Sequence, residues 1–348
     1  MRALLVALAL LAACASTQRR LPADEGAAGA EPGSPADADL AGKNDEELLA
    51  IGTAAASAGD DRRAAAAFGR LADAFPASPH VVAALRGAAV ALGRSDRWDL
   101  ALERFRQLEA RGDGAQRAFA RFGEAEARYN LGELDEAHRI LDALASAPET
   151  SAADRIRALA QRGVVELEAG RTADAERSLR AALALWDEAS EKARLAPRDA
   201  AQAQFWLGEV YREAAAAIRV DPSAGDDEAL SRALEEKSRL LLSAQGHYLR
   251  AIRLGDVEFA IAAGARVGEL YDELHDELLR APLPPGLDAA GEAAYREALR
   301  DDLRVLVAKA ISAYEQTIDA ARRTGVEDHQ FLRAAEANLA RLKQVAAE

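Results

Sequence analysis

The sequence contains one cysteine, Cys14, so no disulfide within the chain can stabilise its fold. Aromatic residues are also scarce, at 5% of the chain, although 50% of the residues are apolar. Alanine supplies much of this apolar fraction, and its small side chain and high helix propensity favour closely packed helices. The composition therefore excludes a disulfide scaffold and favours a helical protein.

Runs of basic residues are missing as well. The formal net charge is −14 at pH 7, and no run of Lys or Arg forms a basic patch. This charge balance argues against nucleic-acid binding and against electrostatic adhesion to anionic lipid. After Ala13 no segment is apolar over the roughly 20 residues that a membrane-spanning helix needs.

Sequence motifs of enzymes are absent. The chain contains no glycine-rich phosphate loop, no HExxH and no GxSxG. Its five histidines are scattered at no ligand spacing, and His275, which lies among carboxylates, is the nearest approach to a metal ligand. A surface position is the simpler explanation of His275, so we expect no catalysis, no metal and no other cofactor. The histidines are His80, His138, His247, His275 and His329.

What the chain does have is a repeated spacing of small and bulky residues. Four times a small residue is followed twelve positions later by Ala, and four positions after that by Phe or Leu. Successive sets begin 37, 36 and 38 residues apart, at positions 52, 89, 125 and 163. A period of this length predicts stacked helical hairpins rather than one globular core. The sets are Gly52–Ala64–Phe68, Ala89–Ala101–Phe105, Ala125–Ala137–Leu141 and Gly163–Ala175–Leu179.

The spacing has a physical reason in the packing of two antiparallel helices. We expect the small residue of the first helix to meet the Ala of the second, and the bulky residue one turn later to fill the space up to the next hairpin. Gly in each turn can end a helix in the left-handed conformation, and Asp or Ser can cap the next helix. Pro76 and Pro148 follow second helices, where a helix must stop. The predicted turns begin at Gly59, Gly93, Gly132 and Gly170.

The segment Leu48–Pro76 resembles the tetratricopeptide repeat family. Several of its residues fall at signature positions, and Arg128–Leu144 fits through the turn and second helix. The resemblance covers Asp45–Trp186 and implies an all-α, right-handed α-solenoid whose first helices line a concave face. The signature aromatic of the first helix is mostly missing, and the groove positions lack the Asn and Lys of the family's clamp for C-terminal peptides. The matching residues are Leu48, Ile51, Gly52, Ala64, Phe68 and Pro76.

Beyond the fourth repeat the hairpin pattern continues with longer spacings. Gly208 precedes Ala244 by 36 residues and Gly268 precedes Ala310 by 42, where an ordinary repeat has 12, so the insertions have 24 and 30 residues. Both insertions contain proline and are flanked by helix-forming sequence. We expect two hairpins with lengthened helices and proline-bearing turns, projecting from one edge of the solenoid, and a capping helix over 326–348.

The N-terminus has the pattern of an export signal. Arg2 precedes the apolar run Ala3–Ala13, which is too short to span a bilayer and has the form of a secretory signal peptide. Leu11–Cys14 (LAAC) resembles the lipobox of bacterial lipoproteins, which implies cleavage before Cys14 and attachment of acyl chains such as palmitate. Ala15 stands where an Asp usually retains such proteins at the inner membrane, so the resemblance favours the outer membrane, facing the periplasm. The predicted divisions are a signal peptide (1–13), a lipidated and disordered tether (14–43), four repeats (44–190), two extended hairpins (191–325) and the capping helix (326–348).

Residues of the first helices form the candidate partner-binding groove. Phe119, Phe122 and Tyr129 recur at helical spacing and are either anchors for a peptide or helix, or side chains buried between hairpins. The acidic residues of Glu269–Leu278 follow one side of a predicted helix, either as a solvated face or as a docking stripe for a basic segment. The predicted groove residues are Phe119, Phe122, Glu126, Tyr129, Phe205, Glu209, Arg212, Glu269 and Asp272.

Two classes of function fit this sequence. The first is a lipid-anchored scaffold or assembly factor of an outer-membrane or trans-envelope complex, with other envelope proteins as partners. Its plan resembles that of repeat lipoproteins in β-barrel assembly and secretion machinery. The second is a periplasmic solute- or glycan-binding protein, or an enzyme accessory, with a pocket between the C-terminal hairpins. The absence of an acid/base or metal constellation favours the first class.

Overall fold

The computed structural model describes residues 39–189, 196–222, 227–327 and 329–346, and in these ranges the chain forms helices joined by turns. The chain divides into two compact units, residues 39–170 (the first unit) and 171–346 (the second unit). The first unit contains α3 (Asp45–Ser57), α4 (Asp61–Ala74), α5 (Val81–Arg94), α6 (Trp98–Arg111), α7 (Gly114–Asn130), α8 (Leu134–Ser146) and α9 (Ala152–Glu168). The second unit contains α10 (Thr172–Glu188), α11 (Pro197–Ala216), α12 (Asp227–Leu254), α13 (Val257–Arg280), α14 (Ala289–Thr324) and α15 (Gln330–Val345).

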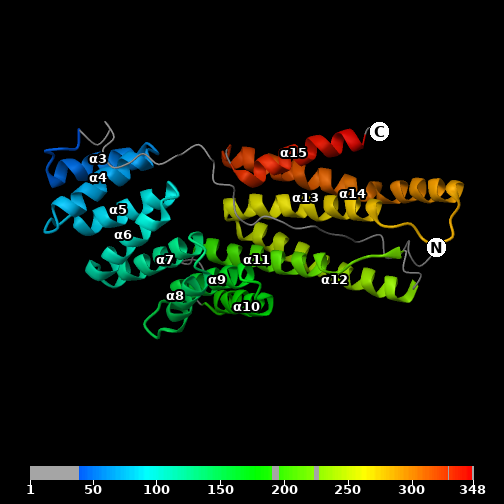
Figure 1. Ribbon diagram of the computed structural model, residues 1–348, viewed down its shortest axis with the longest axis horizontal. Coiled ribbons are helices and arrows are strands. Elements are labelled where there is room, and N and C mark those ends of the chain that lie inside the picture. Colours follow the sequence, from blue (N-terminus) through cyan, green and yellow to red (C-terminus); the bar gives the residue numbers. More distant parts are fainter. Residues whose placement is uncertain (1–38, 190–195, 223–226, 328, 347–348) are drawn as a thin grey trace. The chain divides into compact units, whose positions relative to one another are not determined.

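Within each unit, helices that follow one another in the sequence pack against one another (Figure 1). The all-α class and the succession of hairpins are therefore confirmed. None of the helices described combines the length and the apolar character that a transmembrane segment requires.

Polar side chains begin some of these helices. Asn44 Oδ1 accepts from the backbone N–H of Glu47 at 2.8 Å, while Glu47 Oε2 accepts from the backbone N–H of Asn44 at 3.0 Å. Asp60 caps α4 by accepting from the backbone N–H of Arg63. By contrast, α6, α8 and α10 begin without a side-chain cap. The predicted Asp or Ser caps are thus correct only for α4.

The turn glycines follow the prediction with one exception. Gly59 and Gly132 have the left-handed backbone predicted for the turns, with φ of 75° and 80°. Gly93 instead lies inside α5, and Asp96 takes the left-handed conformation at φ 54°. A Cβ added to Gly93 would come 2.9 Å from the Trp98 ring. Gly93 therefore permits close packing and does not form the turn.

Phe68 shows how the repeat spacing packs the hairpins of the first unit. Its ring lies against Gly52 of its own hairpin and against Gly87 of the next, where added Cβ atoms would come within 2.6 Å of the ring. Gly123 makes the same room for Phe105. The contact with Gly87 confirms that the bulky residue fills the space up to the next hairpin, whereas the contact of Phe68 with Gly52 of its own hairpin was not predicted. The alanines of the pattern are fully or almost fully buried: Ala64, Ala89, Ala101, Ala125 and Ala137.

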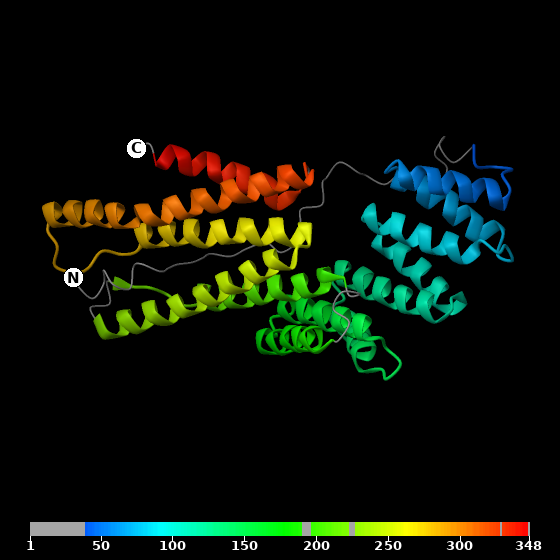
Figure 2. The same cartoon turned by 180° about the vertical axis from the view of Figure 1, so that it is seen from behind.

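The late hairpins, α11–α12 and α13–α14, have the lengthened helices predicted from the insertions. Tyr248 lies against Gly208 and Tyr314 lies against Gly268, which repeats the contact of small with bulky residues. Proline lies in both connecting turns. The extended ends of the two hairpins lie at the same end of the second unit, as Figure 1 and, from behind, Figure 2 show. Within α14, the residues before Leu303 are exposed or half-buried.

Phe205 occupies the centre of an aromatic cluster in the second unit. Its ring centroid lies 5.7 Å from that of Tyr248, 5.8 Å from that of Phe259 and 6.0 Å from that of Phe331. Phe331 belongs to α15, so this cluster joins the last helix to α11, α12 and α13. Helix α15 packs on α13 and α14 and buries Leu332. It lies where the capping helix was expected.

Candidate functional site: a buried ion-pair network

The predicted groove residues of the first unit divide between core and surface. Phe122 is 1% exposed, and the Arg157 guanidinium lies 4.2 Å from its ring centroid. Phe119 and Tyr129 are half-buried, and Glu126 is exposed. Phe122 therefore belongs to the packing between helices, which is the second of the two alternatives that the sequence left open, and it does not line an open groove.

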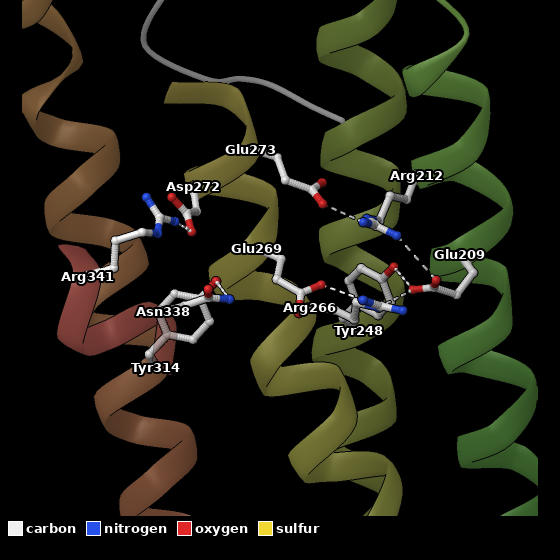
Figure 3. Close-up of polar contacts among 10 residues, drawn as sticks. All are labelled: Glu209, Arg212, Tyr248, Arg266, Glu269, Asp272, Glu273, Tyr314, Asn338 and Arg341. Atoms are coloured by element: carbon white, nitrogen blue, oxygen red, sulfur yellow. Dashed lines mark hydrogen bonds and ion pairs between the residues drawn. The ribbon is translucent and has the colours of Figure 1, made fainter. Parts of the chain in front are cut away.

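The predicted groove residues of the second unit are mostly buried. Phe205 lies in the aromatic core, and Glu209 and Asp272 are 6% and 4% exposed. Arg212 and Glu269 are half-buried. The four charged residues belong to a network of ion pairs among the helices of this unit (Figure 3). Phe205, Glu209 and Asp272 are therefore buried between helices and do not line an open groove.

Glu209 is the centre of this network. Its Oε1 accepts hydrogen bonds from the Tyr248 hydroxyl and from Arg266 Nε, the latter at 3.0 Å. Its Oε2 lies 3.5 Å from Arg212 Nη1. Arg212 Nη2 in turn donates to Glu273 Oε1 at 2.6 Å. One carboxylate of α11 thus meets side chains of α12 and α13, and its own arginine neighbour extends the network (Figure 3).

Burial and neighbouring charges shift the pKa values of Glu209, Tyr248 and Glu273. Burial by itself would raise the pKa of Glu209, but Arg266 and Arg212 outweigh burial and hold this pKa below its ordinary value. Burial and the Glu209 carboxylate raise the pKa of Tyr248 well above its ordinary value, so the phenol remains a hydrogen-bond donor. Burial also raises the pKa of Glu273 despite the neighbouring Arg212. Glu209 is therefore held as an anion between two guanidinium groups.

The acidic residues along one side of α13 form ion pairs with cationic side chains. Asp272 is buried and pairs with Arg341 of α15. Glu277 pairs with Lys237 of α12, whose Nζ also donates to the Ile218 carbonyl at 2.8 Å. These residues form neither a solvated face nor a docking stripe, because most of their charges are neutralised inside the unit. The pairs are Glu269–Arg266, Asp272–Arg341, Glu273–Arg212, Asp276–Arg280 and Glu277–Lys237.

Further polar contacts hold α15 on α13 and α14. Besides the ion pair with Asp272, Asn338 Nδ2 of α15 donates to the Tyr314 hydroxyl at 3.2 Å. The guanidinium of Arg266 lies 5.0 Å from the ring centroid of Phe331, at cation–π distance. Because Arg266 also contacts Glu209, the same network joins α15 to α11.

His275 is buried rather than at the surface, which corrects the sequence expectation. It is 7% exposed, and its Nδ1 lies 3.3 Å from Asp276 Oδ1. In the part of the chain that the structure describes, no three His, Cys, Asp or Glu side chains gather as a metal site. The carboxylates of this region are ion-pair partners of cationic side chains.

Sequence reasoning found Arg212 but missed the other cations of the network. The predicted set contains the carboxylates but not Arg266, Arg341 or Lys237. The Arg266–Glu269 pair has the i, i+3 spacing of a helical ion pair, so this part could have been found. Arg341 belongs to α15 and Lys237 to α12, so neither lies on the same helix as its acidic partner on α13. Spacing along one helix therefore cannot identify them as partners.

No protein-family model matches the sequence, and no curated protein is similar to it. The chain is distantly similar to helical repeat proteins. A tetratricopeptide repeat protein from Parabacteroides merdae is 14% identical over 84% of this chain and 98% of its own, with a TM-score of 0.40. A circular tandem repeat protein with a novel repeat topology is 15% identical over 87% of this chain and 70% of its own, with a TM-score of 0.25. At this distance the likeness adds no argument, and the fold rests on the helices and contacts described above.

Proposed function

We propose that this protein is a lipid-anchored scaffold or assembly factor for protein complexes of a bacterial cell envelope. The observation that carries the proposal is the succession of helical hairpins in both units. Hairpins packed in series expose long helix faces, and such surfaces bind peptide or helix segments of other proteins. The partners in this proposal are other envelope proteins.

The proposed anchor is Cys14, which lies outside the described residues. Its support is the sequence alone: the apolar run Ala3–Ala13 and the lipobox-like segment Leu11–Cys14. Several acyl chains on one residue give stable membrane attachment, whereas one chain gives only marginal binding. Ala15 after the cysteine favours the outer membrane, with the protein facing the periplasm.

A non-enzymatic role is part of the proposal, because the charged side chains gathered in the second unit are engaged with one another. The alternative is solute or glycan binding between the C-terminal hairpins. It has less support, since Phe205, Tyr248 and Phe259 pack together there. A shallow hollow of about 590 Å³ lies instead along α3, and its lining residues are Glu46, Leu49, Ala50, Thr53, Ala54 and His80.

Cys14→Ser is expected to release the protein from membranes into the soluble periplasmic fraction, because serine cannot receive the thioether-linked lipid. Fractionation of cells followed by immunoblotting measures the shift, and metabolic labelling with palmitate should mark the wild type and not the Cys14→Ser protein. A matched control is Ala15→Ser, which keeps the cysteine and should remain membrane-bound. A Cys14→Ser protein that stays on membranes after a high-salt wash would contradict the lipid anchor.

Crosslinking in intact cells tests the scaffold role. A photoreactive amino acid at position 126, where Glu126 is exposed on the first helix of its hairpin, is expected to form adducts with other envelope proteins. Arg139, whose side chain is 68% exposed on the second helix of the same hairpin, is the control position and should form few. Adduct masses and peptide identification provide the readout. The absence of protein adducts at position 126 would count against a partner at the first helices.

A further inference from the structure

Two arginines lie on the exposed side of α12, in the unit whose acidic helix α13 is largely paired. Arg250 and Arg253 are exposed, and neither forms an ion pair with a residue that the structure describes. Arg250 Nε donates to Gln204 Oε1 at 3.3 Å, and Arg253 Nε donates to the Leu249 carbonyl at 3.2 Å. Both groups are thus held by neutral oxygens, and no carboxylate in the described part of the chain pairs with either.

A third arginine, Arg180 of α10, reaches α11 as Arg250 does, and it also pairs with Glu176 of its own helix at 2.9 Å between Nε and Oε1. Arg180 donates to the hydroxyl of Tyr211, which also bonds Glu176. The Tyr211 ring stacks on His247, with centroids 5.4 Å apart and 12° between the planes. His247 Nδ1 donates at 2.7 Å to Gln204 Oε1, the same oxygen that accepts from Arg250. Arg180, Arg250 and Arg253 are hereafter the basic patch.

The guanidinium groups of the basic patch are close enough to influence one another. Burial, Arg253 and Arg180 together lower the pKa of Arg250. Burial, Arg250 and Arg180 lower the pKa of His247 to about 4, against the opposing effect of Glu176, so the imidazole is uncharged at neutral pH. Three guanidinium groups thus lie near one paired carboxylate, Glu176, so the local charge is positive although the chain as a whole is acidic. A bound anion would relieve the repulsion among the guanidinium groups.

Exposed apolar side chains lie on the same face of α12. Leu242 and Leu249 are 42% and 43% exposed. Together with Gly246, Arg250 and Arg253 they follow helical spacing, which puts all five on one side of the helix. A Cβ added to Gly246 would meet only the Arg250 guanidinium, at 3.6 Å, so the backbone of a partner can approach the helix there.

We propose that this face of α12, with Arg180 of α10, binds an acidic segment of a partner protein. Asp or Glu side chains of the segment meet the basic patch, and an apolar side chain lies between Leu242 and Leu249. The inference rests on the proposed scaffold function and specifies the chemistry of its partner. The net charge of −14 repels a long polyanion such as a nucleic acid, which disfavours its binding. A short acidic segment is influenced mainly by the charges within about one Debye length, which here are those of the basic patch. A second copy of this acidic chain is the competing occupant.

Fluorescence anisotropy with the full-length protein tests the inference. The probe is a fluorescein-labelled helical peptide of Glu and Leu, and the control probe has Lys in place of Glu. We expect saturable binding of the acidic peptide alone, weakening as NaCl rises from about 0.05 to about 0.3 M because salt screens exposed charges. No binding of the acidic peptide, or equal binding of both peptides, would overturn the inference.

Charge-reversed variants locate the binding. Arg250→Glu combined with Arg253→Glu is expected to weaken peptide binding at least about tenfold. Arg296→Glu combined with Arg300→Glu makes the same change of net charge on an exposed part of α14 and should leave binding unchanged. Both proteins should keep the wild-type melting curve, because all four arginines are exposed. Equal weakening in the two variants would mean that net charge alone attracts the peptide, and the inference would fall.

Sedimentation identifies the competing occupant. If the wild type forms a dimer that the Arg250 and Arg253 reversals dissociate, the face binds a second copy and the inference is wrong. Failure of the scaffold proposal gives a different result. A protein that crosslinks to envelope proteins but does not bind the acidic peptide keeps the scaffold proposal and loses the basic patch. A protein that binds the peptide but forms no crosslinks to envelope proteins keeps the basic patch and loses the scaffold proposal.

Discussion

Replacing Glu209 with alanine is expected to lower the free energy of unfolding of the second unit by about 3–5 kcal/mol. The change removes the carboxylate that Arg266 and Arg212 share, and it leaves both guanidinium groups inside the unit with less counter-charge. It also leaves the Tyr248 hydroxyl without its acceptor. Hydrogen exchange of α11–α13 under increasing urea measures this loss separately from unfolding of the first unit.

Glu228→Ala is the matched control for this substitution. The Glu228 side chain is 84% exposed and pairs with Arg232 on the same helix. An exposed pair of this kind contributes about 0–1 kcal/mol. Glu209→Gln keeps an acceptor for Tyr248 and should lose less than the alanine variant. Equal losses in Glu209→Ala and Glu228→Ala would contradict a stabilising role of the network.

The same carboxylate makes stability depend on pH in a definite direction. The pKa of Glu209 in the folded state lies below the ordinary value of 4.5. Its stabilisation is therefore complete above that value and is lost as the pH falls through the lower folded-state pKa. Glu273, whose pKa is raised by burial, acts in the opposite sense, so its unfavourable contribution disappears on acidification. The difference in stability between wild type and Glu209→Ala should shrink as the pH falls below 4.5.

Gly208→Ala is expected to destabilise the second unit by about 1–3 kcal/mol through overpacking, and Gly208→Val by more. An added Cβ would come 2.3 Å from the Tyr248 ring. The ring cannot move aside easily, because its hydroxyl donates to Glu209 and its centroid lies 5.7 Å from that of Phe205. Thermal unfolding measured by circular dichroism, with hydrogen exchange to assign the unit, provides the measurement.

Gly246→Ala separates steric overlap from helix propensity. Gly246 also lies inside a helix, but an added Cβ would meet only the end of the Arg250 side chain. Replacing glycine with alanine there should stabilise α12 by up to about 1 kcal/mol. Tyr248→Ala in the Gly208→Ala background should cost less than the sum of the two single changes, because it removes the overlapping ring. An unchanged melting temperature for Gly208→Ala would refute the packing role.

The helical hairpins could be predicted from the sequence because their causes are local. The spacing that places Phe68 on Gly52 also places Tyr248 on Gly208 once the insertion is counted as extra helix length. Such a pattern depends only on helix periodicity and on the space between two packed helices. Gly93 shows its limit, because a glycine near a helix end can serve either a turn or a close ring contact. In this structure Gly93 makes room for the Trp98 ring and does not form the turn.

By itself, the sequence determined the helical class and the short and long hairpins, and the lipid anchor at Cys14 is a proposal that rests on the sequence alone. Only the tertiary structure decided which charges meet. The acidic residues of α13 form a stripe along their own helix, but their partners come mainly from α11, α12 and α15. Arg180 and Arg250 are 70 positions apart in the sequence and yet lie close enough that Arg180 contributes to lowering the pKa of Arg250. The relative rotation and offset of packed helices determine such meetings, and the periodicity of a single helix does not specify either quantity.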